Sequence, residues 1–446
     1  MTMTTNPTTD LRAFGIERLT AMQEDMDRTT QTCDNVVLLS PTGSGKTLAF
    51  TLPLLRYVDA AVDALQAVVV VPTRELAQQS EAVLRRAVTG VRSMCLYGGR
   101  PAMDEHRSMK QVRPQVVFAT PGRMNDHLDK GNLSGLGVKV LVVDEFDKCV
   151  ELGFQDEMAR LVAAMPRVGH CWLTSATDAT EIPQFIAGIG QGRKWQRIDY
   201  LTETDEVKGR MQEYVVKSPE KDKLTTLGHL LTHIGGQPAI VFVAHRESVE
   251  RIGAWLKSKG FFAVSYHGGM EQDARERALY RFRSGAANVL VSTDLAARGL
   301  DIPEVRVVIH YHLPLKAEDY THRNGRTARW DADGQVYLLQ GPTEPLPEFA
   351  NDAEPLHIPT DRIAVSKPRY VSIYIGRGKR DKLSRADVLG FLCKKGGAKA
   401  TDIGRIDIGP HHAYASLLRS RAKEVLAQVA NEKIKGMKTL IEEMRR

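Results

Sequence analysis

The chain has 446 residues, of which 42% are hydrophobic and 26% charged, with a formal net charge of +7. This length exceeds that of one compact domain and the composition is that of a globular protein, which excludes a single small module and a wholly disordered chain. Five scattered cysteines without a Cys-x-x-Cys pair exclude a disulfide framework and a cysteine-based zinc site. No apolar run approaches the ~18 residues of a membrane span, and residues 1–10 lack a signal sequence, so we expect a cytoplasmic protein without membrane contact.

Positive charge is concentrated at the C-terminal end. Residues 369–446 contain 18 Lys and Arg against 8 Asp and Glu, a net of +10, which leaves the rest of the chain slightly acidic. A basic terminal module favours an anionic partner, nucleic acid above all.

Apolar runs alternate with amphipathic stretches through the first 310 residues. Strands are predicted at residues 36–39, 68–71, 116–119, 138–143, 172–174, 240–243, 263–266, 289–292 and 307–310. Continuous apolar strands between helices are typical of parallel sheets covered on both faces. The run before Arg74-Glu75 is echoed by the run before Arg246-Glu247, which suggests two similar units in tandem.

The last 78 residues follow a different pattern. Strands are predicted at residues 371–375, 403–408, 412–417 and 436–441, and helices at 384–394 and 418–431. The order β-α-β-β-α-β indicates a small α+β domain of the ferredoxin-like or RRM type.

A glycine-rich loop follows the first predicted strand and precedes a helix. It predicts an ATP site formed by Ser40, Pro41, Thr42, Gly43, Ser44, Gly45, Lys46 and Thr47. The glycines let backbone N–H groups surround phosphate oxygens, Lys46 supplies a cation for the β- and γ-phosphates, and the Thr47 hydroxyl is suited to Mg²⁺.

Acidic residues follow the strand predicted at 138–143. A carboxylate at such a strand end holds Mg²⁺ in P-loop enzymes, partly through water, and a neighbouring acid orients the attacking water. We assign the first role to Asp144 and the second to Glu145. ATP and Mg²⁺ are therefore the expected cofactors, with no other metal.

At these motifs the chain resembles the DEAD-box family of RNA-dependent ATPases and helicases, and the match continues in the family's order over about 310 residues. The resemblance implies an α/β fold with two tandem RecA-like domains. It implies that Gln23 reads the adenine while Thr20 supports the phosphate loop. It also implies that Ser175 and Thr177 bond Asp147 and couple hydrolysis to domain closure.

The same resemblance implies RNA contacts and a second set of nucleotide contacts. The RNA-binding residues are expected to be Pro72, Thr73, Arg74, Gly99, Thr120 and Arg123, followed by Gln272, Arg275, Thr293 and Gly299. Asp301 is expected to bind the ribose and His322 to assist coupling. Arg326 and Arg329 are expected to act as catalytic arginine fingers, because the planar guanidinium matches the equatorial oxygens of the transferred phosphoryl group.

Some positions depart from the family's pattern. Phe146 stands where the family has Ala, and Asn324 and Ala328 replace the usual Ile and Gly. Because the expected chemistry runs through Asp144 and Glu145, we expect activity to survive.

The basic tail resembles the RNA-binding domain of the DEAD-box protein A subfamily of bacterial helicases. The matching cations are Arg377, Lys379, Arg380, Lys382 and Lys435. The resemblance implies binding to large-subunit ribosomal RNA and pre-ribosomal particles. Independently, the standard RRM stacking motif is absent, and only Tyr374 and Tyr414 are placed by alternation on the open sheet face, so recognition of RNA shape and phosphates is favoured. A solvated basic face without a ligand is the alternative.

These inferences predict four segments: a RecA-like ATP-binding domain at 1–203, a second RecA-like domain at 204–358, a linker at 359–368 and an RRM-like domain at 369–446. The expected function is that of a monomeric ATP-dependent RNA helicase that locally unwinds 23S ribosomal RNA during large-subunit assembly. Phe146 motivates an alternative, an ATP-gated RNA clamp or annealing chaperone without productive unwinding. A DNA helicase of the same superfamily is the third hypothesis.

Overall fold

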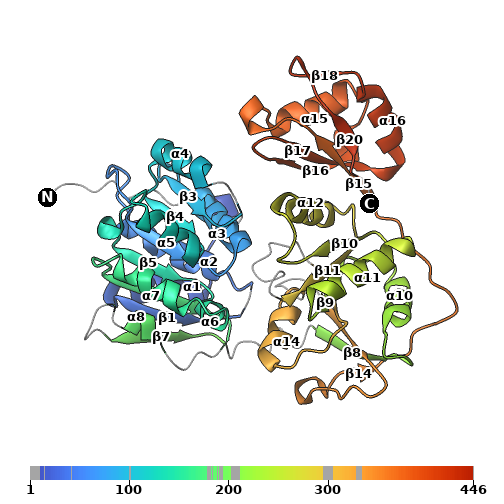
Figure 1. The fold of residues 1–446 in the computed structure, drawn as a ribbon, viewed down its shortest axis with the longest axis horizontal. Coiled ribbons are helices and arrows are strands. Elements are labelled where there is room, and N and C mark those ends of the chain that lie inside the picture. The colour runs from blue at the N-terminus through green and yellow to red at the C-terminus, as the bar shows by residue number, and fades with distance from the viewer. Residues whose placement is uncertain are drawn as a thin grey trace. The chain divides into compact units, whose positions relative to one another are not determined.

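The computed structural model describes residues 11–14, 16–41, 43–99, 102–177, 182, 184–187, 189, 194–201, 211–294, 305–327 and 334–444 (Figure 1). They form two compact units, one up to residue 201 and one from residue 211 onwards. None of the described helices is both long and apolar enough to cross a membrane.

The first unit is built on a seven-stranded parallel sheet in the order β3-β4-β2-β5-β6-β1-β7. Its strands are β1 (Asn35–Leu39), β2 (Ala67–Val70), β3 (Ser93–Leu96), β4 (Val116–Ala119), β5 (Val140–Val143), β6 (His170–Ser175) and β7 (Trp195–Asp199). The helices are α1 (Ala21–Thr32), α2 (Lys46–Leu54), α3 (Arg74–Ala87), α4 (Ala102–Val112), α5 (Pro121–Asp129), α6 (Phe146–Glu151), α7 (Gln155–Ala163) and α8 (Gln184–Ala187). Because the strands are parallel, the motifs that follow β1, β2, β4, β5 and β6 meet at one edge of the sheet.

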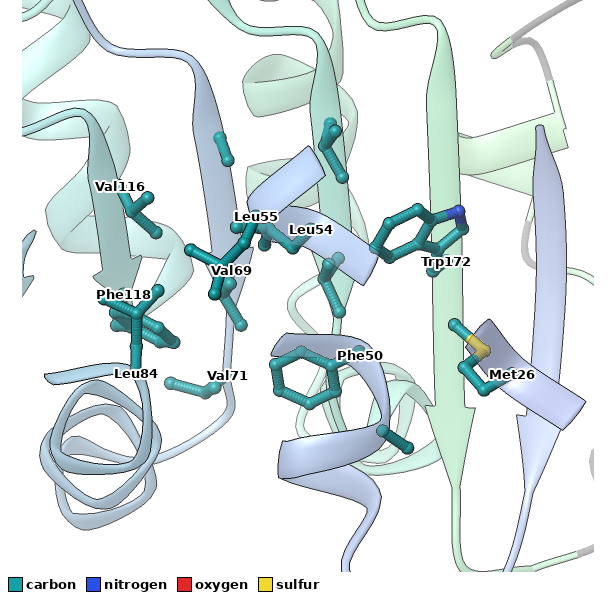
Figure 2. Packing of buried hydrophobic residues seen from close by; sticks show 14 of the residues in the cluster. Met26, Phe50, Leu54, Leu55, Val69, Val71, Leu84, Val116, Phe118 and Trp172 are labelled. Atoms are coloured by element: carbon teal, nitrogen blue, oxygen red, sulfur yellow. The ribbon is translucent and has the colours of Figure 1, made fainter. Parts of the chain in front are cut away.

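Alternate residues of the central strands enter two separate hydrophobic clusters, one on each face of this sheet. Val36 and Leu38 of β1 belong to one cluster, and Val37 and Leu39 to the other. Figure 2 shows the first cluster, where Trp172 of β6 lies among side chains of helices α1 and α2. Burying each such side chain contributes roughly 1.5–3 kcal/mol, so the sheet is a rigid base for the loops at its edge.

The second unit contains another seven-stranded parallel sheet, in the order β10-β11-β9-β12-β13-β8-β14. Its strands are β8 (Met211–Lys217), β9 (Ala239–Val243), β10 (Ala263–Tyr266), β11 (Val289–Thr293), β12 (Val307–His310), β13 (Gly334–Gln340) and β14 (Glu354–Pro355). The described helices are α10 (Leu224–His233), α11 (Arg246–Ser258), α12 (Gln272–Arg283) and α14 (Ala317–Asn324). The predicted α/β architecture with two tandem RecA-like sheets is confirmed.

The segment predicted as a linker packs along the second unit. Ile363 and Val365 contact that unit's hydrophobic core. The backbone N–H of Ala364 donates to Thr232 Oγ1 at 3.0 Å, and the Thr232 hydroxyl donates back to the Ala364 carbonyl at 3.1 Å. These contacts tie the segment to helix α10.

The tail forms a four-stranded antiparallel sheet in the order β16-β17-β15-β20, as expected for the α+β class. Its elements are β15 (Tyr370–Ile375), α15 (Arg385–Lys394), β16 (Ile403–Ile408), β17 (Ala413–Leu418), α16 (Arg419–Val429), β18 (Lys433–Ile434), β19 (Met437–Lys438) and β20 (Ile441–Glu443). The prediction of one continuous last strand at residues 436–441 was wrong. Gly436, at φ 78°, belongs instead to the turn of the small β18–β19 hairpin, and β20 begins only at Ile441.

Candidate ATP site and RNA-binding surfaces

The phosphate loop joins β1 to α2, as the sequence predicts. Gly43 and Gly45 have φ values of 83° and 93°, a conformation that L side chains rarely adopt, so both positions favour glycine. The ammonium group of Lys46 is buried and donates to the carbonyls of Ser40 at 2.6 Å and Pro41 at 2.8 Å. Its charge therefore lies within the loop that is expected to surround the phosphates.

The rest of this loop follows the same plan. Ser44 Oγ donates to the Pro41 carbonyl at 2.8 Å, and Thr47 stands in the first turn of α2. Thr42 lies outside the described residues.

Gln23 fixes the start of α1 against the phosphate loop. Its Oε1 accepts from the Thr20 backbone N–H at 3.0 Å, while the Thr20 hydroxyl accepts from Gln23 N, so the two residues form a capping box. Gln23 Nε2 donates to the Gly45 carbonyl at 3.3 Å. A Cβ at Gly45 would lie 2.6 Å from that nitrogen, so a clash with Gln23 is a second reason why this position favours glycine.

The two carboxylates predicted to be catalytic, Asp144 and Glu145, follow β5, beside the end of β6. Asp144 is buried, and Thr174 donates through its hydroxyl to Asp144 Oδ1. Burial raises the pKa of Asp144, and the Thr174 hydrogen bond and the Lys46 charge oppose that rise. Glu145 adopts φ 53° and ψ 50°, a left-handed conformation that costs roughly 1–2 kcal/mol for a non-glycine residue. Its backbone N–H is held by Thr174 Oγ1 at 3.3 Å.

Of the two hydroxyls predicted to bond Asp147 at this edge, that of Thr177 does so, whereas that of Ser175 bonds Thr177 instead. Thr177 donates through Oγ1 to Asp147 Oδ2 at 3.0 Å, and Ser175 Oγ donates to the Thr177 carbonyl at 2.9 Å. In the sequence, Phe146 stands between the carboxylate residues Glu145 and Asp147. Its side chain is only 2% exposed and packs in the hydrophobic cluster on one face of the sheet. The residue that departs from the family therefore fills the core and does not point among the carboxylates.

The RNA-binding residues predicted after β2 and β3 are also adjacent. The Thr73 hydroxyl caps α3 by accepting from Leu76 N at 3.3 Å, and Arg74 begins that helix directly after Pro72-Thr73. Gly99 has φ 92°, and a Cβ there would lie 2.4 Å from Arg74 Nη1. Glycine at this position therefore leaves room for the Arg74 guanidinium.

Thr120 and Arg123 lie at the start of α5, and Arg123 has a partner that the sequence reasoning missed. Arg123 Nε donates to Glu105 Oε2 at 2.7 Å, and the fully buried His127 contacts the same oxygen through Nε2 at 3.0 Å. Glu105 is itself buried, on helix α4. No motif signals this contact, because it depends on how α4 and α5 pack.

In the second unit, Arg326 and His322 are both buried at the end of α14. The neighbouring Arg323, which we did not single out, forms a bidentate ion pair with Asp294: its Nε lies 2.5 Å from Oδ1 and its Nη2 2.8 Å from Oδ2. Arg323 Nη1 also donates to the His312 carbonyl at 2.7 Å. This pair joins the segment after β11 to the segment that carries the predicted arginine finger.

Asn324 is another departure that the structure explains. Its Oδ1 lies 2.9 Å from Nε2 of the fully buried His310. His310 Nδ1 faces Arg323 Nη1 at 3.1 Å, so the proton resides on Nε2 and Asn324 accepts it. Gly299, Asp301, Ala328 and Arg329 lie outside the described residues.

The remaining RNA-binding predictions of this unit fall on β11 and α12. Thr293, at the end of β11, is 9% exposed, and Gln272 Nε2 donates to Glu276 Oε1 at 3.1 Å. Arg275 is buried and donates to Tyr266 Oη from Nε at 3.2 Å and from Nη2 at 2.9 Å. Its side chain is thus directed to its own sheet, and its RNA contact stays a prediction.

The predicted RNA-binding cations of the tail form one cluster. Lys435 in the β18–β19 turn donates to the Lys382 carbonyl at 2.8 Å and lies 3.1 Å from Asp387 Oδ2, which brings the hairpin to the loop after β15. Lys379, Arg380, Lys382 and Lys435 are exposed. Arg377 is half-buried and pairs with Asp381 Oδ1 at 3.0 Å. The tail therefore presents a cationic surface made of two segments.

Three family models match the chain in order. One described as DEAD/DEAH box helicase matches residues 20–185, one described as Helicase conserved C-terminal domain matches 222–331, and one described as DbpA RNA binding domain matches 372–443. The chain belongs to the DEAD-box RNA helicases. It is an RNA-dependent ATPase with a DbpA-type RNA-binding domain, which confirms the predicted family, enzyme class and RNA partner.

Relatives resemble this DEAD-box helicase over nearly its whole length. The Escherichia coli protein named ATP-dependent RNA helicase DbpA is 33% identical over 440 residues, which cover 96% of this chain and 95% of the relative. The Bacillus subtilis protein of that name is 27% identical with the same coverage. Among solved structures, Saccharomyces cerevisiae Dbp5 bound to RNA and ADP BeF3 matches with a TM-score of 0.67 and 26% identity, covering 79% of this chain and 92% of that one.

The helicase's ATP site also fits a magnesium ion held mainly by nucleotide. Within the described ranges, no group of three or more His, Cys, Asp or Glu residues is arranged to bind a metal. Mg²⁺ usually needs only one or two protein carboxylates, together with water and phosphates. Asp144 and the hydroxyl of Thr47 supply donors of that kind.

Proposed function

We propose that this DEAD-box helicase remodels structured 23S ribosomal RNA during assembly of the large ribosomal subunit. The observation that carries the proposal is the DbpA-type tail with its exposed cationic cluster. A relative from Emericella nidulans named ATP-dependent rRNA helicase rrp3, 32% identical over 74% of this chain, supports a ribosomal substrate. Such a substrate would place a bacterial protein in the cytoplasm.

In the proposed mechanism, Lys46 and the loop amides bind the β- and γ-phosphates. Bound Mg²⁺ would be held by Thr47 and Asp144 and would neutralise charge on the phosphates. Glu145 orients the attacking water from its fixed left-handed backbone, and its carboxylate accepts the water's proton. The ion pair between Arg323 and Asp294 positions the segment from which Arg326, together with Arg329, stabilises the transition state.

Hydrolysis is coupled to RNA binding through the contact between Asp147 and Thr177. Asp147 stands two residues after Glu145, in the first turn of α6, and Thr177 follows β6. A change in the position of one carboxylate is thereby transmitted along the edge of the first sheet. Coupled closure of the two RecA-like domains would bend and separate a short RNA duplex, and we propose that the helicase acts as a monomer.

The ATP-site assignment is tested with Glu145→Gln, measured as RNA-stimulated ATP hydrolysis. We expect a loss of about 100-fold or more, because a positioned general base contributes 10²–10⁴-fold. Glu151→Gln, an exposed change on the same helix, is the matched control and is expected to hydrolyse ATP at the wild-type rate. Equal hydrolysis by Glu145→Gln and wild type would overturn the assignment.

The ribosomal target is tested by crosslinking the full chain to total bacterial RNA and sequencing the captured fragments. We expect enrichment of 23S ribosomal RNA at a few sites. Capture spread evenly over messenger and transfer RNAs would refute the target while leaving the ATPase assignment intact.

The clamp alternative receives no support from the residue that suggested it. Phe146 packs in the core, away from the carboxylates. A strand-displacement assay on a short RNA duplex distinguishes the two functions, since a clamp would bind RNA with nucleotide and release no strand. The DbpA-type RNA-binding domain and the RNA helicases among the relatives likewise favour RNA over the DNA hypothesis.

A further inference from the structure

The open face of the tail sheet packs against helix α12 of the second RecA-like domain. Tyr280 of α12 donates through Oη to the Arg405 carbonyl in β16 at 2.6 Å. Its ring lies 4.9 Å, centroid to centroid, from the ring of Tyr414 in β17. The Ser284 hydroxyl, at the end of α12, lies 3.2 Å from the Ser372 hydroxyl in β15. Three strands of the tail therefore contact one helix.

The contacting residues of α12 follow helical periodicity. Arg277, Tyr280 and Ser284 are spaced i, i+3 and i+7, which places them on one side of the helix. The Arg277 guanidinium stands over the Tyr374 ring at 5.9 Å. Tyr280 and Ser284 are buried, as are their partners Ser372 and Tyr414. The contact is thus a packed interface.

Two further contacts connect the tail to the second RecA-like domain. The Arg419 guanidinium, at the start of α16, stands over the Phe262 ring at 4.6 Å. The segment that leads into β15 is tied to helix α10 by Ala364 and Thr232. The segment that connects the tail to the domain therefore packs on the domain and is not a free flexible linker.

This packing determines which side of the tail meets RNA. In RRM domains the open sheet face stacks bases, and here that face carries Tyr374 and Tyr414. Tyr414 is 5% exposed beneath α12, so a base cannot stack on it while the tail is in place. Lys379, Arg380 and Lys435 remain exposed on the loop side.

Helix α12 also carries residues of the second RecA-like domain that are predicted to bind RNA. Gln272 opens the helix, and Arg275 lies in its first turn, directed to Tyr266. The side that contacts the tail begins at Arg277. A single rigid helix thus joins the RNA-contacting edge of the second RecA-like domain to the tail.

We propose that α12 links the tail to the two RecA-like domains and that Tyr280 is the positioning residue that holds the tail on this helix. The tail stays on α12 while its loop side binds RNA. The proposal rests on the proposed function only for the identity of that RNA. A fixed tail raises the effective concentration of the adjoining RNA segment at the RecA-like domains more than a loosely tethered tail does.

The first test locks the interface. In Ser284→Cys/Ser372→Cys the two side chains are expected to crosslink on mild oxidation or with a short bismaleimide, and each single variant is the control for the native cysteines. We expect the crosslinked helicase to keep wild-type ATPase stimulation by 23S ribosomal RNA. Absence of a crosslink with either reagent would overturn the proposal. So would a loss of stimulation that reduction of the disulfide restores.

The second test loosens the interface with Tyr280→Ala. We expect the affinity for 23S ribosomal RNA to stay within about threefold of wild type, while the RNA concentration for half-maximal ATPase rises about tenfold at unchanged kcat. Tyr280→Phe, which keeps the ring contact, should recover most of the difference. Stimulation by poly(A), a single strand without tertiary structure, should not change in either variant.

These readouts separate the possible failures. A variant that merely destabilises the second domain would lower kcat with poly(A) as well, and that result would refute the positioning role. If 23S ribosomal RNA stimulates the wild type no better than poly(A), the ribosomal target fails. The crosslinking result still decides whether the tail stays on α12.

Discussion

Thr177 donates a hydrogen bond to Asp147 at 3.0 Å and so joins the segment after β6 to helix α6, which follows the proposed catalytic carboxylates. The bond links two segments that are far apart in the sequence. Because Asp147 stands two residues after Glu145, we expect the bond to transmit the state of the nucleotide site without taking part in the chemistry.

Thr177→Val should therefore separate ATP hydrolysis from strand displacement. A hydrogen bond to a carboxylate is worth about 1.5–3 kcal/mol, so we expect displacement of a short RNA duplex to fall about tenfold or more. RNA-stimulated ATPase should fall far less. Thr177→Ser keeps the hydroxyl and should restore displacement. A parallel loss of both activities would show that the bond supports catalysis itself.

Gly99 and Gly90 provide a matched pair for testing the RNA contact predicted for Arg74. Both have positive φ values, 92° and 91°, but a Cβ at Gly99 meets Arg74, whereas nothing lies within 4 Å of one at Gly90. Alanine at either position should cost roughly 1–2 kcal/mol of folding free energy. Only Gly99→Ala should also weaken RNA binding, by about tenfold, because it displaces a charged contact. Equal RNA affinities, measured by fluorescence anisotropy, would contradict the role of Arg74.

Phe146→Ala restores the residue that the family usually has at that position. Because Phe146 is 2% exposed in the core, we expect the free energy of unfolding to drop by about 3–5 kcal/mol. ATPase activity per folded molecule should remain near wild type. Phe154→Ala, at a half-buried neighbour, should cost less. An increase in ATPase activity would instead show that Phe146 restrains the site.

The stability of the second unit should fall in mild acid. Burial, with help from the Arg323 charge, lowers the pKa of His310 to about 3, although the Asn324 hydrogen bond opposes this shift. Below the ordinary histidine pKa of about 6.5 the unfolded chain gains a proton that the folded chain does not, so stability decreases as pH falls from 6.5 towards 3. The expected slope is about 1.4 kcal/mol per pH unit for one group. In calorimetric unfolding of the full chain, His310→Gln should reduce the slope of the free energy of unfolding against pH. An unchanged slope would exclude His310 as the source of this pH dependence.

Salt dependence should locate the tail's RNA-binding surface. Replacing Lys379, Arg380 and Lys382 by Gln should make the slope of log affinity against log salt shallower by about 2–3, since each lost phosphate contact removes roughly 0.7–0.9. The same change at Lys394, Lys395 and Lys399, which are exposed outside the cluster, is the control. Equal slopes for both triple variants would mean that total charge matters and position does not.

The structural features that could be predicted from the sequence are those encoded by local sequence patterns. The phosphate loop, the acidic turn after β5 and the buried central strands are each encoded by a few consecutive residues. The strands that were missed include β7 and β8, in which several side chains are exposed and a continuous apolar run is lacking. Their pairing with β1 and β13 defines them as strands.

The contacts that were missed depend on packing between distant segments. Glu105 reaches Arg123 because α4 lies beside α5, and Asp294 reaches Arg323 because β11 and α14 are neighbours in space. Asn324 was noted only as a departure, since its partner His310 precedes it on another element. Tyr414 was correctly placed on the open sheet face, but no pattern in its neighbourhood indicates that α12 covers that face.

The strand that precedes the phosphate loop has a consequence for biosynthesis. β1 comes early in the chain, yet it lies between β6 and β7, which are formed by residues 170–175 and 195–199. During translation, the segment that binds the phosphates therefore has no neighbouring strands until almost the whole first unit has left the ribosome. A nascent chain should become able to retain nucleotide late and abruptly, and truncated translation products that end before β6 should not bind ATP.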